Sequence, residues 1–326
     1  MNPREGRGFP APSAYFPPQG GWVVTSGHSK KTASGWKPSL AGRQNITGWA
    51  FLLPASLMIA WMNFYPMVQA ALLSLQAGQG AKLSFAGLRN YEYLFKDPIF
   101  RQSMTNNFLF LLIQVPVMLV LALILATLLN DPKLKFRGLF RTMIFLPCAT
   151  SLVSYSIIFR SLFDINGFVN TVLVRSGILS EGINWLNGAW TARIVVVVAL
   201  IWRWTGYNMV FYLAGLQSIE GSIYEAALID GASWLQRFTK ITVPLLRPII
   251  LLTAILSTNG TLQLFDESFN LTRGGPANMT ITMSHYIYKA TFQQVPKFGY
   301  SAAMSFVIFI LVAILALAQM KVGDKR

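Results

Sequence analysis

The residue types that suggest a specific chemistry gather in the segment 224–244, YEAALIDGASWLQRFTKITVP, which lies between two long apolar runs. Ser222 is expected to cap a helix that carries Glu225 in its first turn, where a carboxylate suits the positive end of the helix dipole. The small side chains of Ala226 and Ala227 allow another surface to approach closely. Such a segment is typical either of a docking surface for another chain or of an ordinary amphipathic loop at a membrane interface.

The second half of this segment predicts a turn, a second helix and a return to apolar sequence. Gly231 is expected to end the first helix, and a second helical piece is expected to begin near Ser233. Its larger side chains recur at roughly helical spacing: Trp234, Leu235, Phe238 and Ile241. Pro244 lacks a backbone donor and is predicted to mark the point where the chain enters the next apolar run.

Several other chemistries are absent from the sequence. A phosphate-binding P-loop requires a Gly-Lys pair, and this chain contains none. The only histidines, His28 and His285, are predicted to lie in the N-terminal tail and in an external loop, so no metal site is expected. Cys148 is the single cysteine, and no disulfide is expected. Asp266 and Glu267 are adjacent, and neighbours on a helix face different directions, which argues against a paired-carboxylate site.

The composition indicates which environment must position these residues. The 326 residues are 53% hydrophobic and only 12% charged, whereas soluble domains carry roughly 25% charged residues. A net charge of +15 would also suit a nucleic-acid partner. The basic residues, however, stand in short segments between apolar runs rather than on one face of a fold, so membrane lipid is the expected surroundings and no nucleic acid is expected.

The apolar runs predict six transmembrane helices in an all-α polytopic membrane protein, since about 20 residues cross the hydrocarbon core. We place these spans at 47–74, 107–130, 140–163, 193–217, 246–268 and 299–320. The third and fifth contain small polar residues, which is typical of helices that face other helices or a cavity. Before the spans, residues 1–45 are rich in Pro, Gly, Ser and basic residues and are predicted to be disordered. They lack the apolar core of a signal peptide.

Charge predicts the orientation of these spans. Six spans place both ends of the chain on one side of the membrane, and sixteen of the 27 basic residues fall on that side together with six acids. The other side carries eleven basic and six acidic residues. Positive charge accumulates on cytoplasmic segments, so both termini and the segment 224–244 are predicted to be cytoplasmic.

The segment 224–244 also resembles a known signature. Glu225-Ala226-Ala227, three further residues, Gly231, nine further residues and Ile241-Thr242-Val243-Pro244 resemble the EAA motif of permease subunits in binding-protein-dependent ABC importers. Four other stretches resemble the sugar branch of that family, the maltose, lactose and glycerol-phosphate type: FAGLRNYEYLF (85–95), FRTMIFLP (140–147), WRWTGYNMVFYLAGLQSI (202–219) and LFDESFNLTRGGPANMT (264–280). The resemblance runs from about residue 46 to the end of the chain.

The resemblance implies a type I ABC importer permease fold with a cytoplasmic coupling helix that docks into a cleft on an ATPase subunit. It implies the following domains: a disordered basic cytoplasmic tail (1–45), a first transmembrane helix with a periplasmic loop (46–102), a permease core (103–320) containing the EAA loop (222–244), and a short cytoplasmic tail (321–326). The residues expected to couple to the ATPase are Glu225, Ala226, Ala227, Gly231, Ile241 and Pro244. The implied partners are a second, similar permease, two ATPase subunits that bind ATP and Mg²⁺, and an external substrate-binding protein. This chain itself is expected to hold no cofactor and to catalyse no reaction.

The resemblance also places a sugar path along the fourth and fifth spans, although the register is loose. The substrate-path candidates are Trp204, Tyr207, Ser257, Thr261, Gln263 and Leu264. Arg203 lies within the fourth span, where it either pairs with Asp266 and Glu267 or binds an anionic substrate. The external segments 76–103 and 271–298 are either docking sites for the binding protein or simple connectors. Within the second segment, Arg273–Pro276 is expected to form a tight turn.

Two other classes of membrane protein remain as alternatives to an ABC permease. An ion-coupled secondary transporter would use the loop 222–244 only as a connector, but such carriers usually keep acids or histidines in the membrane as proton relays and contain inverted repeats. Neither feature is evident in this sequence. A non-transporting membrane scaffold is the second alternative, and it would have no need of polar residues on its inner helices.

Overall fold

The computed structural model describes the backbone of residues 40–80 and 82–323, with side chains from residue 47 onward. The chain divides into two units, residues 1–59 and 60–326, and each is described by itself. Most of the predicted tail, residues 1–39, lies outside the described residues. The first helix begins at Leu40, inside the range predicted as tail.

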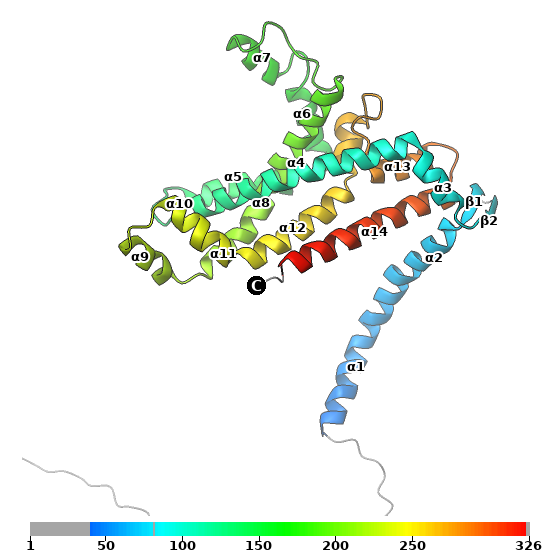
Figure 1. The fold of residues 1–326 in the computed structure, drawn as a ribbon, viewed down its shortest axis with the longest axis horizontal. Helices are drawn as coiled ribbons and strands as arrows, with labels where there is room; N and C mark the ends of the chain where they lie inside the picture. Colours follow the sequence, from blue (N-terminus) through cyan, green and yellow to red (C-terminus); the bar gives the residue numbers. More distant parts are fainter. Residues whose placement is uncertain (1–39, 81, 324–326) are drawn as a thin grey trace, which may run out of the picture. The chain divides into compact units, whose positions relative to one another are not determined.

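Nearly all regular structure in the described chain is helical, which confirms the predicted all-α class (Figure 1). The α-helices are α1 (Leu40–Ile59), α2 (Tyr65–Ser74), α3 (Arg89–Lys96), α4 (Pro98–Leu129), α5 (Arg137–Ala149), α6 (Leu152–Leu162), α7 (Phe168–Arg175), α8 (Ala189–Gln217), α9 (Gly221–Ile229), α10 (Trp234–Arg237), α11 (Val243–Leu245), α12 (Arg247–Leu262), α13 (Met283–Tyr288) and α14 (Phe298–Gly323). The π-helical turns are η1 (Ala60–Phe64), η2 (Phe238–Thr242), η3 (Glu267–Thr272) and η4 (Lys289–Gln293). The strands β1 (Gln76–Gln79) and β2 (Lys82–Phe85) pair antiparallel, with Gln76 opposite Phe85.

Four helical stretches of the described chain are long and apolar enough to cross a membrane: Thr47–Ser74, Pro98–Leu129, Ala189–Gln217 and Phe298–Gly323. Two bent pairs, Arg137–Ala149 with Leu152–Leu162 and Trp234–Leu245 with Arg247–Leu262, bring the number to as many as six. The predicted count of six spans agrees with this upper number. The second span begins at Pro98, nine residues before the predicted start at 107, because polar residues continue its helix outward.

The third and fifth spans differ from the straight helices that the sequence predicts. Helices α5 and α6 meet at 101°, with Thr150 in an extended conformation between them. The side chains of Thr150 and Arg203 donate hydrogen bonds to the carbonyls of Pro147, Cys148 and Thr150, so three of the carbonyls at this break have donors. The fifth predicted span, 246–268, stops being helical at Leu262, and Leu264 and Phe265 are irregular. Hydropathy alone does not detect either break.

The core of residues 60–326 forms between long helices that run side by side. Helix α4 packs along α8 and α12, and α12 packs along α14 (Figure 1). Buried apolar side chains fill the contacts, with Phe110 and Val196 at one level and Leu123 and Met209 at another. These helices therefore form a bundle that holds side chains from α4, α8 and α12 close to one another.

Helix α5 approaches α8 unusually closely, and a glycine permits this. A Cβ atom added to Gly206 would overlap the carbonyl oxygen of Ile144, which belongs to the backbone of α5. Small residues at helix contacts are typical of membrane proteins, where close packing replaces the hydrophobic effect as the main source of helix association. Gly206 therefore sets how near α5 lies to α8.

The segments 76–103 and 271–298, for which simple connectors were one alternative, are structured. The Asp97 carboxylate caps α4 by accepting a hydrogen bond from the Ile99 amide and also accepts hydrogen bonds from the hydroxyls of Tyr286 and Tyr300. Burial opposes ionisation of Asp97, but these hydrogen bonds outweigh it and hold the pKa of its carboxyl below the ordinary value. One buried carboxylate thus joins the start of α4 to α13 and α14.

The prediction that His285 lies in a loop was wrong, and its external position stays a prediction. His285 belongs to the short helix α13, is only 4% exposed and contacts Ser268 through its Nδ1 atom at 2.8 Å. Burial, together with the nearby charge of Lys289, lowers the pKa of His285 to about 4. The turn predicted at Arg273–Pro276 is present, with Arg273 and Gly274 both at positive φ.

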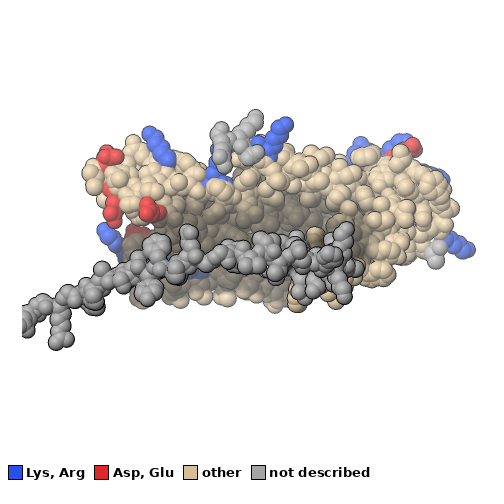
Figure 2. All heavy atoms as spheres, turned by 90° about the horizontal axis from the view of Figure 1, so that it is seen from below, with Lys and Arg blue, Asp and Glu red and all other residues tan. Residues whose placement is uncertain are grey.

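Charged side chains are unevenly placed on the surface of the described residues. In Figure 2, Lys and Arg side chains stand along the upper edge and at both ends of the molecule, and Asp and Glu lie mainly at the left end.

Candidate functional site

The loop after α8 forms the predicted helix–turn–helix. Helix α9 ends in a Schellman motif, in which Ala232 N–H donates to Ala227 O and Gly231 N–H donates to Leu228 O. Gly231 has φ +75°, the left-handed conformation in which a Cβ is strained. Helix α10 begins directly afterwards with a capping box between Ser233 and Gln236.

Two details of the predicted docking helix are wrong. The N-cap of α9 is Glu220 rather than Ser222, and its side chain makes no capping hydrogen bond. The helix begins at Gly221, so Glu225 lies beyond the first turn. The helix dipole therefore contributes little to Glu225, because this effect falls off within the first turn.

Helix α9 has no buried residue, and all of its residues except the half-buried Tyr224 and Ala227 are exposed. Glu225 and Ala226 are exposed, and the large apolar side chains of Leu228 and Ile229 are 60% and 86% exposed. Figure 1 shows α9 beyond the ends of the long helices. Exposed apolar side chains beside a carboxylate are typical of a protein–protein contact surface.

The loop is mechanically joined to the membrane helices. Tyr224 Oη and Thr242 Oγ1 lie 3.0 Å apart, and Thr242 is 2% exposed, so α9 is tied to η2. Ile241 is half-buried beside it, and Pro244 lies in α11. Helices 234–245 and 247–262 then meet at 71°. A displacement of α9 would therefore be passed to α12.

A cavity of about 430 Å³ lies between α4, α8 and α12 and the segment after α12. All six residues predicted for the substrate path line it: Trp204, Tyr207, Ser257, Thr261, Gln263 and Leu264. Gln114 and Asn208 also line it, and sequence reasoning missed both. The signal that could have found Gln114 was its position as a polar residue inside an apolar span.

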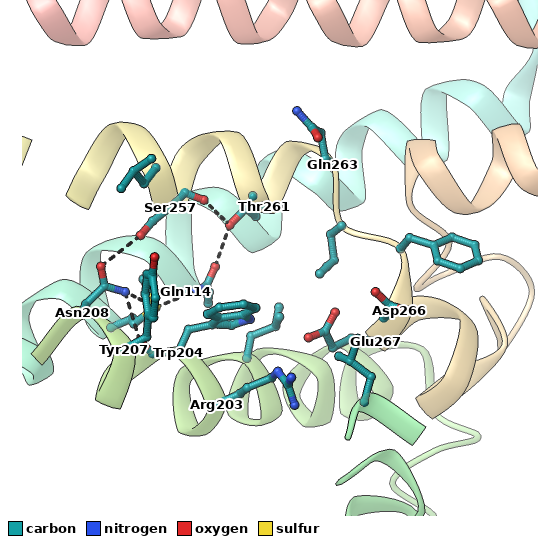
Figure 3. A pocket seen from close by; sticks show the side chains of 17 residues that line it. Gln114, Arg203, Trp204, Tyr207, Asn208, Ser257, Thr261, Gln263, Asp266 and Glu267 are labelled. Atoms are coloured by element: carbon teal, nitrogen blue, oxygen red, sulfur yellow. Dashed lines mark hydrogen bonds between the residues drawn. The ribbon is translucent and has the colours of Figure 1, made fainter. Parts of the chain in front are cut away.

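Polar side chains from three helices form one hydrogen-bonded wall of the cavity (Figure 3). Thr261 Oγ1 donates to Gln114 Oε1 at 3.0 Å, and Ser257 Oγ donates to Asn208 Oδ1 at 3.5 Å. Gln114, Asn208 and Thr261 are 2%, 2% and 6% exposed. Since buried polar groups are costly unless they are paired, this wall is preorganised to exchange hydrogen bonds with a guest.

Aromatic and apolar side chains form the rest of the wall. The rings of Trp204 and Tyr207 stand edge to face, with their centroids 5.7 Å apart. Leu264 is 7% exposed and reaches the cavity because the chain is irregular there. The amide of Gln263 turns away from the other labelled side chains in Figure 3 and donates to Asn259, so Gln263 borders the cavity mainly through its stem.

Arg203 does not form the ion pair that was its simpler interpretation. Its terminal nitrogens donate to the carbonyls of Pro147, Cys148 and Thr150 at 3.2 to 3.4 Å. Its guanidinium lies 4.9 Å from the centroid of the Tyr155 ring, an arrangement that favours a cation. Within the described chain, Arg203 Nε has no hydrogen-bond partner. The break between α5 and α6 frees carbonyls that compete with the carboxylates for this side chain.

Asp266 and Glu267 both line the cavity, contrary to the expectation that neighbouring residues would face apart. Asp266 precedes the π-helical turn η3 and follows an irregular stretch, so ordinary helical geometry does not apply to the pair. Glu267 is 3% exposed, and its Oε1 atom has no hydrogen-bond partner among the described residues. Figure 3 shows both carboxylates beside the cavity.

The long apolar helices, the polar cavity between them and the protruding loop define a membrane transport subunit. Residues 118–326 match the family described as binding-protein-dependent transport system inner membrane component. The chain belongs to this family and is a multi-pass bacterial membrane protein. The resemblance stated from the EAA motif is thereby confirmed, and the ion-coupled transporter and the scaffold are excluded.

Individual proteins of known name match nearly the whole chain. The lactose transport system permease LacF of Rhizobium radiobacter is 49% identical over 292 residues, which is 89% of this chain and 98% of that protein. The arabinooligosaccharide permease AraP of Halalkalibacterium halodurans is 32% identical over 278 residues, or 85% and 87% of the two chains. The crystal structure of a bacterial ABC transporter for the acidic polysaccharide alginate matches with a TM-score of 0.76 at 22% identity, over 87% of this chain and 96% of that one. This likeness confirms the type I permease fold.

Proposed function

We propose that the chain is a membrane-spanning permease subunit of an ATP-driven sugar importer and conducts a di- or oligosaccharide through the cavity beside Trp204 and Tyr207. The observation that carries the proposal is the composition of that cavity. Aromatic rings stack on the apolar faces of sugars, and hydrogen-bonding side chains such as Asn208 and Thr261 exchange with hydroxyl groups. The 49% identity to a lactose permease supports the same substrate class.

The exposed helix α9 is the proposed contact with an ATPase subunit. Glu225 would face basic groups of the ATPase, and Leu228 and Ile229 would fill an apolar cleft. The chain has no P-loop, so ATP and Mg²⁺ would be held by that partner. The contact between Tyr224 and Thr242 would transmit movement of the ATPase to α12.

A second permease of similar fold is the proposed partner within the membrane. Helices α5 and α6 carry large apolar side chains that nothing in the described chain covers, among them Met143, Leu146, Val153 and Ile157, which are between 56% and 62% exposed. Lipid would accept these side chains, but the cavity also opens beside this region, since Leu152 of α6 lines it. A second subunit would close the cavity on that side.

The loop with α9 is proposed to face the cytoplasm together with both termini. The segments that carry β1, β2, α3 and α13 would then face the substrate-binding protein on the outside, because they lie toward the other end of the long helices (Figure 1). The family description requires such a binding protein.

The experiment is uptake into proteoliposomes that contain the complete importer, with ATP inside and the binding protein outside. We expect uptake of radiolabelled lactose that needs internal ATP and persists when a protonophore is present. Trp204→Ala is expected to reduce uptake about tenfold, because stacking on an aromatic ring contributes about 1–1.5 kcal/mol. Trp61→Ala, which removes a 70% exposed ring that does not line the cavity, is the matched control.

Three outcomes would contradict the proposal. They are uptake without ATP, loss of uptake with the protonophore alone, and normal transport by the Trp204→Ala variant. If no saccharide in a panel of neutral and acidic disaccharides is taken up, the substrate class is wrong.

A further inference from the structure

The charged residues of the cavity lie together at one end. Among the residues that line it, Arg203 is the one cation, and Asp266 and Glu267 are the anions. Their formal charges sum to −1. Arg203 and Glu267 are 5% and 3% exposed, so solvent screens little of any charge that these two side chains carry.

Arg203 is not available to bind an anionic guest. Its NH1 and NH2 atoms are used by the carbonyls of Pro147, Cys148 and Thr150 at the end of α5. Its guanidinium also lies 4.9 Å from the Tyr155 ring centroid. Turning the side chain toward a bound carboxylate would leave the carbonyls of a broken membrane helix without donors.

One oxygen of the Glu267 carboxyl group, by contrast, has no hydrogen-bond partner within the described chain. This atom, Oε1, accepts no hydrogen bond from the described residues, although the residue is only 3% exposed. A carboxylate accepts up to about four hydrogen bonds, and an unsatisfied buried acceptor is unfavourable. A sugar hydroxyl would donate to a carboxylate and bring no charge of its own.

Asp266 occupies a more open position beside Glu267. Asp266 is half-buried, whereas Glu267 is buried, and both line the cavity. The two acids belong to a segment whose irregular start, Leu264 and Phe265, turns both of them toward the cavity.

The fold alone does not determine whether a transporter carries neutral or anionic saccharides. A transporter of the same fold imports the acidic polysaccharide alginate, so the bundle accommodates an anionic guest as well as a neutral one. A charge preference must therefore come from individual side chains.

We propose that Asp266 and Glu267 make this cavity selective for uncharged saccharides, by accepting hydrogen bonds from sugar hydroxyls and by repelling saccharides that carry a carboxylate. This inference rests on the proposed function, because it assumes that a saccharide enters the cavity. Asp266 and Glu267 are both contact residues in it, and Arg203 holds the α5 carbonyls and reduces the negative charge without binding the guest.

The test measures saccharide contact with the purified importer in detergent without the binding protein, so that selection by the binding protein plays no part. Saturation-transfer NMR detects weak ligands on a large complex. The two probes are lactose and the matched disaccharide in which one primary alcohol is oxidised to a carboxylate. We expect the lactose signal of the unmodified importer to exceed that of the oxidised sugar about fivefold or more. The reason is that like charges repel each other strongly in a site of low dielectric constant.

The variants are Asp266→Asn, Glu267→Gln and the two combined, each nearly isosteric with the original residue. The combined variant should bring the ratio of the two signals to about one, because Arg203 then gives the cavity a formal charge of +1. Glu92→Gln, an exposed acid on α3 that does not line the cavity, is the control and should keep the ratio. If Glu267→Gln fails to assemble with its partners, Asp266→Asn alone should still at least halve the ratio.

A ratio near one for the unmodified importer would overturn the inference, and so would an unchanged ratio in the combined variant. Vesicle uptake of lactose by an importer that gives no lactose signal would also overturn it, while the proposed function would stand. If vesicles take up no saccharide at all, the proposed function itself fails.

Discussion

Glu225 is the residue at which the proposed ATPase contact is tested most directly. It is exposed on a helix with no buried residue, so replacing it by Lys should leave insertion and folding intact. The new positive charge would face the basic groups of the ATPase, and like charges across an interface are strongly unfavourable. We expect Glu225→Lys to lower both ATPase co-purification and sugar uptake at least about tenfold, or about 1.4 kcal/mol.

The control for this change is Glu181→Lys, which makes the same charge change in an exposed loop before α8. Equal uptake by the Glu225→Lys and Glu181→Lys variants would show that the contact does not involve Glu225.

Gly231 tests the turn of the docking loop. Its φ of +75° disfavours any side chain, whereas the space around its Cβ position is open. The expected cost therefore comes from the backbone itself and not from neighbouring atoms, about 1–2 kcal/mol for Ala and more for the β-branched Val. ATPase co-purification and uptake should decrease from Gly231 to Ala to Val at matched expression.

Gly221 provides the matched control, because it also has open space at the Cβ position but lacks a positive φ. Gly221→Ala should leave co-purification unchanged. If Gly231→Ala behaves in the same way, the Schellman turn is not needed for docking.

At the scale of elements, the approach of α5 to α8 depends on Gly206. A Cβ there would overlap a backbone oxygen of Ile144, which cannot move aside as a flexible side chain would. Gly206→Ala should therefore destabilise the protein by about 1–3 kcal/mol, as overpacking does, or displace α5. The measurement is thermal unfolding in detergent. The control is Gly260→Ala in α12, where no atom lies within 4 Å of the added Cβ, and this variant should keep or raise the unfolding temperature. An equal decrease for both variants would refute the close contact at Gly206.

The packing of α13 predicts a pH dependence of stability. The folded-state pKa of His285 is about 4, below the ordinary value of 6.5. Between these values the unfolded chain binds more protons, so the contribution of His285 is complete above pH 6.5 and is lost as the pH falls toward 4. The loss from pH 7 to pH 5 should be about 2 kcal/mol.

The check compares the apparent unfolding temperature of the unmodified protein with that of His285→Gln across this range. The variant should show a smaller decrease with falling pH, since Gln does not titrate. Parallel curves for the two proteins would assign the pH dependence to other groups.

At the scale of the whole molecule, orientation remains a prediction from charge. Sixteen of the 27 basic residues belong to the side proposed as cytoplasmic. A fluorescent protein fused after Arg326 should fluoresce, and alkaline phosphatase at the same place should be inactive in intact cells. An active phosphatase fusion would reverse the orientation and place α9 outside, where it could not meet an ATPase.

The sequence by itself determined the membrane class, a number of spans that agrees with the upper count in the structure, the helix–turn–helix after α8 and the family. These features depend on local quantities: hydropathy over about 20 residues, the need for Gly where φ is positive, and a motif of defined spacing. The loop from Glu225 to Pro244 was predictable for this reason, and so was the helix start at Ser233. Even there the cap of α9 was misplaced by two residues, because Ser222 is a favoured cap residue, whereas Glu220 holds the position without a capping hydrogen bond.

Only the tertiary structure decided what lines the cavity and how its charges are arranged. The breaks at Thr150 and after Leu262 bring the carbonyls of α5 to Arg203 and turn Asp266 and Glu267 inward together. A hydropathy pattern contains no information on such breaks, because a bent and a straight span have the same composition. Whether a buried charge pairs with a carboxylate or with a backbone carbonyl depends on which group the packing brings closer, and that choice is made between segments far apart in the chain.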